Sequence, residues 1–393
     1  MKGWKGLVVG LLISLGASSS VSGQELAVPG APTLLSPSAV LMDAASGEVL
    51  LAKNPHEVRN PASVTKLMTL AVVYEAVARG EIAWNDPITA SRRAQEMGGS
   101  QVFLAEGETF ALKDLVAAVA ISSANDAAVA VAEGIAGSQE AFLRHMEELA
   151  RTMGLRDSRF KNVHGLDAEG HGMSAMDIAL LSRWLVNRHP EILQLTRTWT
   201  QTFRPPPKEF VLVNTNTLLK RYPGVDGLKT GWTSASGWSV AITAQRGTTR
   251  LIAVVVGAPT SDERWKDITA MLDWGFAHFE SLVVAREGAT VRMLPVDEGI
   301  QGRVAAVVPE TLAITLPKGE RQKVRQKVEL PARVRAPLKK GQTLGALILE
   351  VDGKAVKNVP LVAGEAVQRL SFGGLWWRTL SSLWPWQQEA APR

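Results

Sequence analysis

The chain has 393 residues, of which 46% are hydrophobic and 21% are charged, values typical of globular proteins and not of disordered ones. This length exceeds that of one typical domain, so at least two domains are expected. Cysteine is absent, which excludes disulfide scaffolds, thiolate zinc sites and cysteine nucleophiles. The formal charge is +5, but no run of Lys and Arg is interleaved with aromatic residues, so no nucleic-acid partner is expected.

The N-terminal segment has the pattern of a secretory signal peptide. Lys2 and Lys5 precede an apolar run over 7–15, which is followed by small residues up to Gly23. The run is shorter than the roughly 20 residues that span a bilayer. We therefore expect a signal peptide over 1–23 and export across the cytoplasmic membrane, with an uncleaved anchor as the alternative. Its removal lowers the formal charge from +5 to +3.

Residues 24–280 have the pattern of an α+β domain. Apolar runs separated by Gly-containing turns predict two hairpins, over 39–52 and over 238–256. Helices are predicted, in chain order, at 63–78, within 112–153, at 175–187 and at 261–279. Because strands are predicted at both ends of this domain, they can share one antiparallel sheet with helices between them.

Residues 281–363 differ from the preceding domain. They consist of short Val-rich runs separated by turn signals at 297–299, 317–319, 340–341 and 352–353. No helical window of convincing length lies among them. This pattern predicts a small all-β domain without catalytic residues.

The tail, residues 364–393, holds four of the twelve tryptophans. On a helix, Leu375, Trp376, Leu380 and Trp384 fall on one side, and Arg378 falls on the other. A Trp-rich amphipathic helix lies well in a membrane interface. We expect this C-terminal helix to anchor the protein to a membrane surface, with packing on its own β domain or on a partner as the alternative.

A candidate nucleophile lies in the segment Pro61-Ala62-Ser63-Val64-Thr65-Lys66. Ser63 stands at the predicted start of a helix, and Lys66 follows three residues later on the same face. The free N–H groups of a helix N-terminus can hold an oxyanion, and burial lowers the pKa of an amine. A neutral Lys66 can then take the proton of Ser63. By itself the motif is weak, because Ser63 can equally be an N-cap.

Two further motifs strengthen the interpretation. Ser123-Ala124-Asn125 lies at the junction of two helical stretches, and Lys229-Thr230-Gly231 directly precedes the second hairpin. Their order and wide spacing after Ser63 match the Ser-x-x-Lys, Ser-x-Asn and Lys-Thr-Gly set of the penicillin-recognising serine enzymes.

The residue types in these motifs suit acyl transfer on a peptide that ends in a carboxylate. Ser123 can relay a proton to a leaving amine, and Asn125 can hold the substrate amide. Lys229 and Thr230 can bind the terminal carboxylate. Gly231 lets a substrate backbone approach the strand closely. No cofactor is expected.

The chain resembles the low-molecular-mass penicillin-binding proteins that act as serine-type D-alanyl-D-alanine carboxypeptidases. The resemblance covers nearly the whole chain, and its motifs lie at 60–66, 123–126, 163–167 and 226–231. It implies a penicillin-recognising, transpeptidase-like domain that cleaves the terminal D-Ala from peptidoglycan pentapeptides through an acyl-enzyme on Ser63. It also implies an oxyanion hole formed by the N–H groups of Ser63 and Trp232. β-Lactams are then trapped substrate mimics, and the enzyme is periplasmic, on the outer face of the cytoplasmic membrane.

Two positions depart from the pattern of such proteins. Trp232 follows Lys-Thr-Gly where His is common, which leaves the backbone donor intact. Thr215 stands between Asn214 and Asn216 where Arg is common, which removes a cation that could help to hold the substrate carboxylate.

Three other interpretations remain open. A class A-like β-lactamase uses similar motifs, but no Glu-x-x-Leu-Asn segment lies between Ser123 and Lys229. A catalytically silent peptidoglycan-binding scaffold would not need the Ser63 hydroxyl. A metal site at His164, Asp167 and His171 matches no zinc spacing, so a Gly-turned loop at the rim of the active site is preferred.

Overall fold

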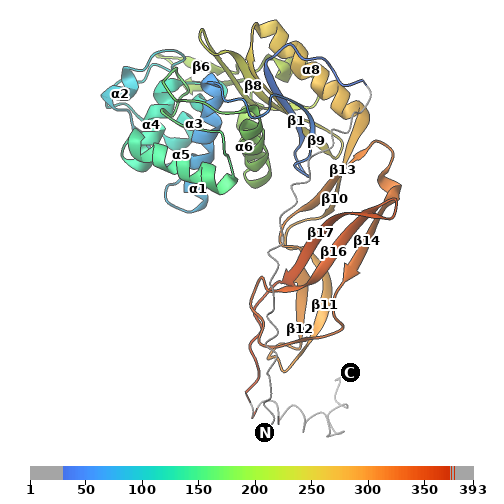
Figure 1. Ribbon diagram of the computed structural model, residues 1–393. Helices are drawn as coiled ribbons and strands as arrows, with labels where there is room; N and C mark the ends of the chain where they lie inside the picture. Colours follow the sequence, from blue (N-terminus) through green and yellow to red (C-terminus); the bar gives the residue numbers. More distant parts are fainter. Residues whose placement is uncertain (1–29, 372, 374–375, 377–393) are drawn as a thin grey trace, which may run out of the picture. The chain divides into compact units, whose positions relative to one another are not determined.

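The computed structural model describes residues 30–371, 373 and 376 (Figure 1). The signal peptide predicted over 1–23 and most of the predicted tail helix lie outside the described residues. Within the described part of the chain, no helix is both long and apolar enough to cross a bilayer.

The first domain is built on a five-stranded antiparallel sheet with the order β2-β1-β9-β8-β7. Its strands are β1 (Ser38–Asp43), β2 (Val49–Lys53), β7 (Val225–Thr233), β8 (Gly237–Arg246) and β9 (Thr249–Ala258). The pairing of β1 with β9 joins the two ends of the domain, from Ser38 opposite Val256 to Asp43 opposite Leu251, as the sequence predicts. The order leaves one side of β7 without a neighbouring strand in this sheet.

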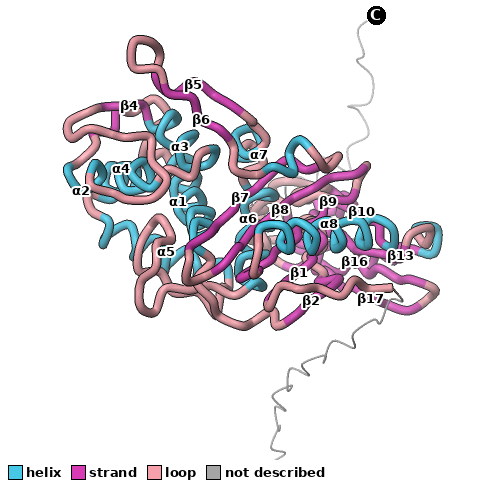
Figure 2. The backbone as a smooth tube through the Cα atoms, turned by 90° about the horizontal axis from the view of Figure 1, so that it is seen from above, coloured by secondary structure: helices cyan, strands magenta, loops and turns pink. Residues whose placement is uncertain are grey.

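Helices cover both faces of the sheet (Figures 1 and 2). They are α1 (Lys66–Ala78), α2 (Arg92–Gln95), α3 (Leu112–Ile121), α4 (Asn125–Ala136), α5 (Gln139–Met153), α6 (Ala175–Arg188), α7 (Ile192–Thr196) and α8 (Ser261–His278). Ile178 of α6 shares a buried cluster with Ala241 of β8 and Val254 of β9. The helix α8 packs on β8 and β9 through other buried residues, among them Met271. Because successive residues of a strand point to opposite faces of the sheet, the strands contribute apolar side chains to a buried layer on each face.

Two small two-stranded sheets were not predicted. They are β3 (Pro87–Thr89) with β4 (Thr109–Ala111), and β5 (Thr200–Arg204) with β6 (Phe210–Val213). Each pairs segments too short to show a clear alternation of apolar and polar residues, which is why the sequence does not reveal them.

The second domain consists of strands, as predicted, and the only described helical turn in it is η3 (Arg321–Lys323). Its strands are β10 (Phe279–Ala285), β11 (Thr290–Asp297), β12 (Arg303–Val307), β13 (Leu312–Pro317), β14 (Val324–Glu329), β15 (Val334–Arg335), β16 (Thr343–Val351) and β17 (Lys354–Ala363). A six-stranded sheet has the order β14-β16-β17-β12-β11-β15, and β10 pairs with β13. Leu294, Val304, Leu347 and Leu361 belong to a separate hydrophobic core.

In the structure the β domain extends beyond residue 363, its predicted end. Bridges join Leu338 to Val367 and Gly299 to Arg369, so the segment after residue 363 still pairs with the β domain. The residues from 364 to 371 are not helical. The segment 364–371, which the sequence analysis assigned to the tail, therefore pairs with the β domain, and the residues predicted to form the amphipathic helix follow it.

Candidate active site

Ser63 lies in a 3₁₀ turn, η1 (Ala62–Thr65), directly before α1 and not in the first turn of an α-helix as predicted. The Val64 N–H donates to the Pro61 carbonyl, the i to i−3 bond that tightens such a turn. A Cβ atom at Gly165 would lie 1.9 Å from the Ala62 carbonyl oxygen, so a loop packs against the turn through a residue that must be glycine. Ser63 is thus held on a tight, supported corner.

Lys66 is fully buried, and three oxygen atoms surround its amine. The Nζ atom lies 3.0 Å from Ser63 Oγ, 2.6 Å from Asn125 Oδ1 and 2.7 Å from the carbonyl oxygen of His164. Burial lowers the pKa of Lys66 well below its usual range, and the positive charge of Lys229 lowers it further against the opposing effect of Asp126. These surroundings favour the neutral amine.

The Ser-x-Asn motif forms the turn between α3 and α4. Ser123 is 4% exposed and has a φ of 63°, an uncommon conformation for a residue other than glycine. Asn125 accepts from Lys66 through Oδ1 and donates through Nδ2 to the Gly98 carbonyl at 2.7 Å. Since Nδ2 carries two hydrogens, one donor remains for a ligand.

Lys229, Thr230 and Gly231 lie on β7, the strand with one unpaired side in the sheet. A Cβ atom at Gly231 would lie 2.4 Å from the Pro61 carbonyl oxygen and 3.0 Å from Ser63 N, so the strand touches the nucleophile turn. Lys229 is buried, and its Nζ donates to the Thr230 carbonyl at 3.0 Å. Burial, with a smaller contribution from the charge of Arg264, lowers the pKa of Lys229 to about 7.

The structure brings residues of all three predicted motifs into one region. Hydrogen bonds join Ser63, Lys66 and Asn125 directly. Backbone packing brings Gly231 of β7 against the Ser63 turn. Ser123 precedes Asn125 by two residues, while Lys229 and Thr230 precede Gly231 and Trp232 follows it.

Several contributors to the site were missed by the sequence analysis. The His164 carbonyl holds the Lys66 amine, but a backbone oxygen has no sequence signal of its own. Asp126 accepts from the N–H groups of Val102 and Leu104 and so fixes the loop that carries the Gly98 carbonyl. Its place directly after the Ser-x-Asn motif was the only available hint.

Thr215 lies at the site through its side chain. Its Oγ1 is 2.6 Å from Oγ1 of Thr230. The flanking Asn214 and Asn216 donate from their side chains to the carbonyls of Thr196 and Gly227, which fixes the segment. The departure at position 215 noted in the sequence therefore replaces an expected cation by a hydroxyl group beside Thr230.

The loop with His164, Asp167 and His171 acts as a support. Nδ1 of His164 accepts from the Leu166 N–H, and Nδ1 of His171 accepts from the Lys161 N–H. Burial lowers the pKa of His164 to about 3 and that of His171 to about 4, so both rings are neutral at pH 7. Within residues 30–371, no group of three or more His, Asp or Glu side chains is arranged to hold a metal ion.

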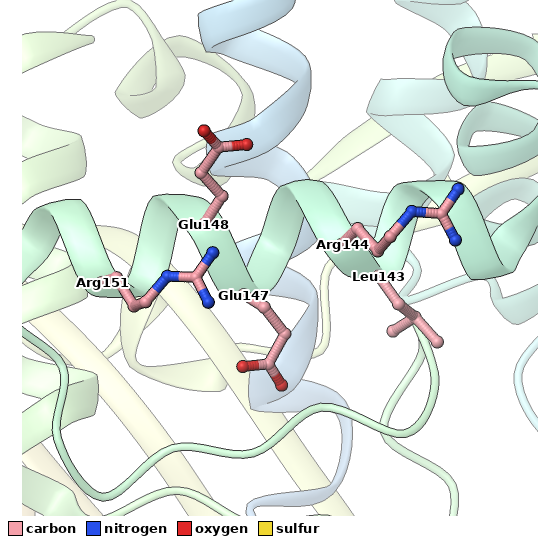
Figure 3. Close-up of a pocket in the computed structure, with 5 residues that line it drawn as sticks. All are labelled: Leu143, Arg144, Glu147, Glu148 and Arg151. Carbon is pink, nitrogen blue, oxygen red and sulfur yellow. The ribbon is translucent and has the colours of Figure 1, made fainter.

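A separate surface hollow lies along α5 (Figure 3). Its volume is about 510 Å³, and its lining residues are Leu143, Arg144, Glu147, Glu148 and Arg151, all from this one helix. In Figure 3 Glu147 and Glu148 point to different sides of the helix. Glu147 accepts from the Phe160 N–H, so it anchors the neighbouring loop. This hollow contains none of the site residues.

A serine hydroxyl, a buried amine with a lowered pKa and a Lys-Thr-Gly strand packed against the serine turn are the features of serine acyl-transfer enzymes of the penicillin-recognising class. Residues 26–260 match the family model described as D-alanyl-D-alanine carboxypeptidase, and residues 279–369 match that of the penicillin-binding protein 5 C-terminal domain. The chain belongs to the D-alanyl-D-alanine carboxypeptidase family. It is a low-molecular-mass penicillin-binding protein and a serine-type D-Ala-D-Ala carboxypeptidase.

Relatives agree with this assignment along nearly the whole chain. The chain is 38% identical over 368 residues to D-alanyl-D-alanine carboxypeptidase DacF of Bacillus subtilis, covering 93% of this chain and 94% of that protein. It is 36% identical to DacC of Escherichia coli, with 88% of each chain covered. The structure of penicillin-binding protein 5 from Haemophilus influenzae matches with a TM-score of 0.74 and 33% identity, over 86% of this chain and 99% of that one. These likenesses favour neither the β-lactamase nor the silent scaffold.

Proposed function

We propose that Ser63 is the nucleophile with which this carboxypeptidase removes the terminal D-Ala of peptidoglycan pentapeptides, and that Lys66 is its base. The arrangement around the Lys66 amine carries this assignment. A neutral amine has two N–H donors and one lone pair. Asn125 Oδ1 and the His164 carbonyl, at 2.6 and 2.7 Å, take the two hydrogens. The lone pair is then left for the Ser63 hydroxyl at 3.0 Å.

This geometry supports the following reaction. Ser63 Oγ bonds to the carbonyl carbon of the penultimate D-Ala while its proton passes to Lys66 Nζ. The N–H groups of Ser63 and Trp232 stabilise the oxyanion. The C–N bond then breaks, Ser123 relays a proton to the leaving D-Ala amine, and water hydrolyses the ester on Ser63.

Lys229 and Thr230 bind the terminal carboxylate of the substrate. The free enzyme holds Lys229 near its point of half-protonation, because its pKa is about 7. A bound carboxylate raises that pKa and restores the positive charge. Thr215, whose hydroxyl touches that of Thr230, adds a hydrogen-bonding group without adding charge.

β-Lactams enter the same reaction as substrate mimics. Opening of the ring breaks the amide bond, but the amine stays tethered to the acyl group and continues to block the site. A structural relative supports this binding: penicillin-binding protein D2 of Listeria monocytogenes, described in an ampicillin-bound form, matches with a TM-score of 0.57 and 32% identity over 62% of this chain.

The test is mass spectrometry of the enzyme with benzylpenicillin, together with D-Ala release from a purified disaccharide pentapeptide. The parent enzyme should gain one penicilloyl group on Ser63 and release D-Ala. Ser63→Ala should lose both activities, whereas Ser138→Ala, which removes only the N-cap hydroxyl of α5, should keep both. An adduct on another residue, or D-Ala release by Ser63→Ala, would overturn the assignment. Rapid loss of the adduct would instead indicate a β-lactamase.

We also propose that the chain is exported by its N-terminal segment and held at the outer face of the cytoplasmic membrane by its Trp-rich tail. The sequence patterns of 1–23 and of the tail support this. Because residues up to 370 pair with the β domain, the tail should be cut after Ser371. Deletion of 372–393 should release the protein from membranes and leave activity on soluble peptides unchanged. Continued membrane retention would contradict the anchor.

A further inference from the structure

The side chain of Trp232 is not used by the reaction described above. Its backbone follows Gly231 beside the Ser63 turn, but its indole is 53% exposed. The ring lies against that of Trp238, the residue opposite it in the β7–β8 pair, with the centroids 5.4 Å apart. Contact between such rings is favourable at this distance. An aromatic surface therefore stands in solvent one residue along β7 from Gly231, which touches the Ser63 turn.

A buried cation supports this pair from below. The Arg264 guanidinium lies 4.8 Å from the ring centroid of Trp238 and 4.1 Å from that of Trp265. Arg264 also donates to the Ser239 carbonyl at 3.3 Å, and its side chain is almost fully buried. Burial lowers the pKa of Arg264 to about 10, so it remains charged at neutral pH. Cation–π contact with the buried Arg264 stabilises the position of Trp238, against which the Trp232 ring packs.

The direction of a bound peptide follows from the proposed roles along β7. The terminal carboxylate lies at Thr230 and the scissile carbonyl lies at the N–H of Trp232. These two residues are roughly 6.6 Å apart along a strand, about the length of one extended substrate residue and its flanking groups. The acyl part of the ligand must then continue past Trp232 toward Thr233. Because alternate residues share a face, the Trp232 indole lies on the side of the strand where Thr230 presents its hydroxyl.

We propose that the Trp232 ring forms a subsite for an apolar group on the acyl side of the scissile bond. In benzylpenicillin this group is the aromatic ring of the acyl substituent on the 6-amino nitrogen. In a peptide it is the aliphatic side chain of the residue that precedes the two D-alanines. The proposal rests on the proposed function, since that function sets the direction of the ligand along β7.

The experiment compares two β-lactams with the same nucleus. Benzylpenicillin carries an aromatic acyl group, and 6-aminopenicillanic acid carries none. Trp232→Ala should lower the second-order acylation rate constant about 3- to 10-fold for benzylpenicillin and change it less than about 2-fold for 6-aminopenicillanic acid. The acylation rate constant of Trp232→Phe for benzylpenicillin should lie between those of the parent enzyme and of Trp232→Ala. Trp184→Phe, a substitution of a half-buried Trp on α6, is the matched control and should leave both rate constants unchanged.

A second measurement uses peptides that end in D-Ala-D-Ala and carry either Lys or Gly before this pair. Trp232→Ala should lower kcat/KM for the Lys peptide and leave that for the Gly peptide close to the parent value. An equal loss for both ligands in either comparison would overturn the subsite, because it would indicate damage to the backbone donor. An unchanged rate for benzylpenicillin would also overturn it. Failure of the parent enzyme to be acylated by either β-lactam would instead overturn the proposed function.

Discussion

Positive charges are placed in opposite ways in the active site and in the β domain. In the site, Lys66, Lys229 and Arg264 are buried, and the hydrogen bonds of their amine and guanidinium groups go to neutral oxygen atoms. Burial lowers the pKa of each of them. In the β domain, exposed Lys327 pairs with Glu329 at 2.7 Å, and the pKa of Lys327 is raised by that hydrogen bond.

This difference separates charges that do chemistry from charges that keep a surface soluble. Burying a cation without a carboxylate opposes folding, and a protein retains it where an altered protonation state is useful. An exposed ion pair contributes little, because water and salt screen it and two long side chains must be ordered. Substitutions in the two regions should therefore have very different effects.

The largest effect is expected at Lys66. Lys66→Gln removes the base that takes the Ser63 proton, so the acylation rate constant for benzylpenicillin should fall by at least about 10³-fold. The acylation rate constant of Lys66→Arg should fall by as much, because a guanidinium stays protonated at neutral pH and cannot act as a base. Stopped-flow acylation checks both variants, and circular dichroism checks that they fold. A Lys66→Arg enzyme with more than a tenth of the parent rate would remove Lys66 from the role of base.

A smaller effect is expected at Lys229, and it depends on pH. Since the pKa of Lys229 is about 7, the cation is lost as pH rises through this value, and the second-order acylation rate constant should decline on the alkaline side. In Lys229→Arg the rate should be lower at pH 7, but the alkaline decline should move above about pH 9. A decline at the same pH in both enzymes would assign it to another group.

Lys229 also makes stability depend on pH. Its pKa in the folded enzyme, about 7, lies below its ordinary value of 10.5. Between these values the unfolded chain binds more protons, so the contribution of Lys229 to the free energy of unfolding rises with pH through this window. Urea unfolding at pH 7 and pH 10 should show this rise in the parent and a smaller one in Lys229→Met. An equal rise in both would contradict burial as the cause.

The smallest effect is expected in the β domain. Lys327→Ala and Glu329→Ala remove the two partners of an exposed pair, and neither should change the melting temperature beyond experimental error at physiological salt. Differential scanning calorimetry of both single variants and the double variant measures any coupling. A clear coupling between them would show that this surface pair, unlike a typical one, stabilises the domain.

Local sequence patterns were sufficient for much of this protein. Apolar runs bounded by turn signals identified the hairpins around β1–β2 and β8–β9, and helical patterns with start and stop signals identified the helices α1, α6 and α8. The spacing of Ser63 and Lys66 suggested that they form a pair, but only the two further motifs made that interpretation strong. The two small two-stranded sheets and the end of the β domain were not recovered, since they depend on pairing with distant backbone.

The sequence by itself determined which residue types are available for chemistry and their order along the chain. Only the tertiary structure decided the state of those residues. The Lys66 amine is held by the backbone carbonyl of His164, 98 positions away, and the hydroxyl of Thr230 meets that of Thr215, 15 positions away. Arg264 of α8 reaches the Trp238 ring and the Ser239 carbonyl of β8, 26 and 25 positions away. Every residue carries the same backbone groups, so the sequence does not reveal which carbonyl will hold a given amine. Contacts between distant segments form only when the chain packs, and local sequence patterns do not record them.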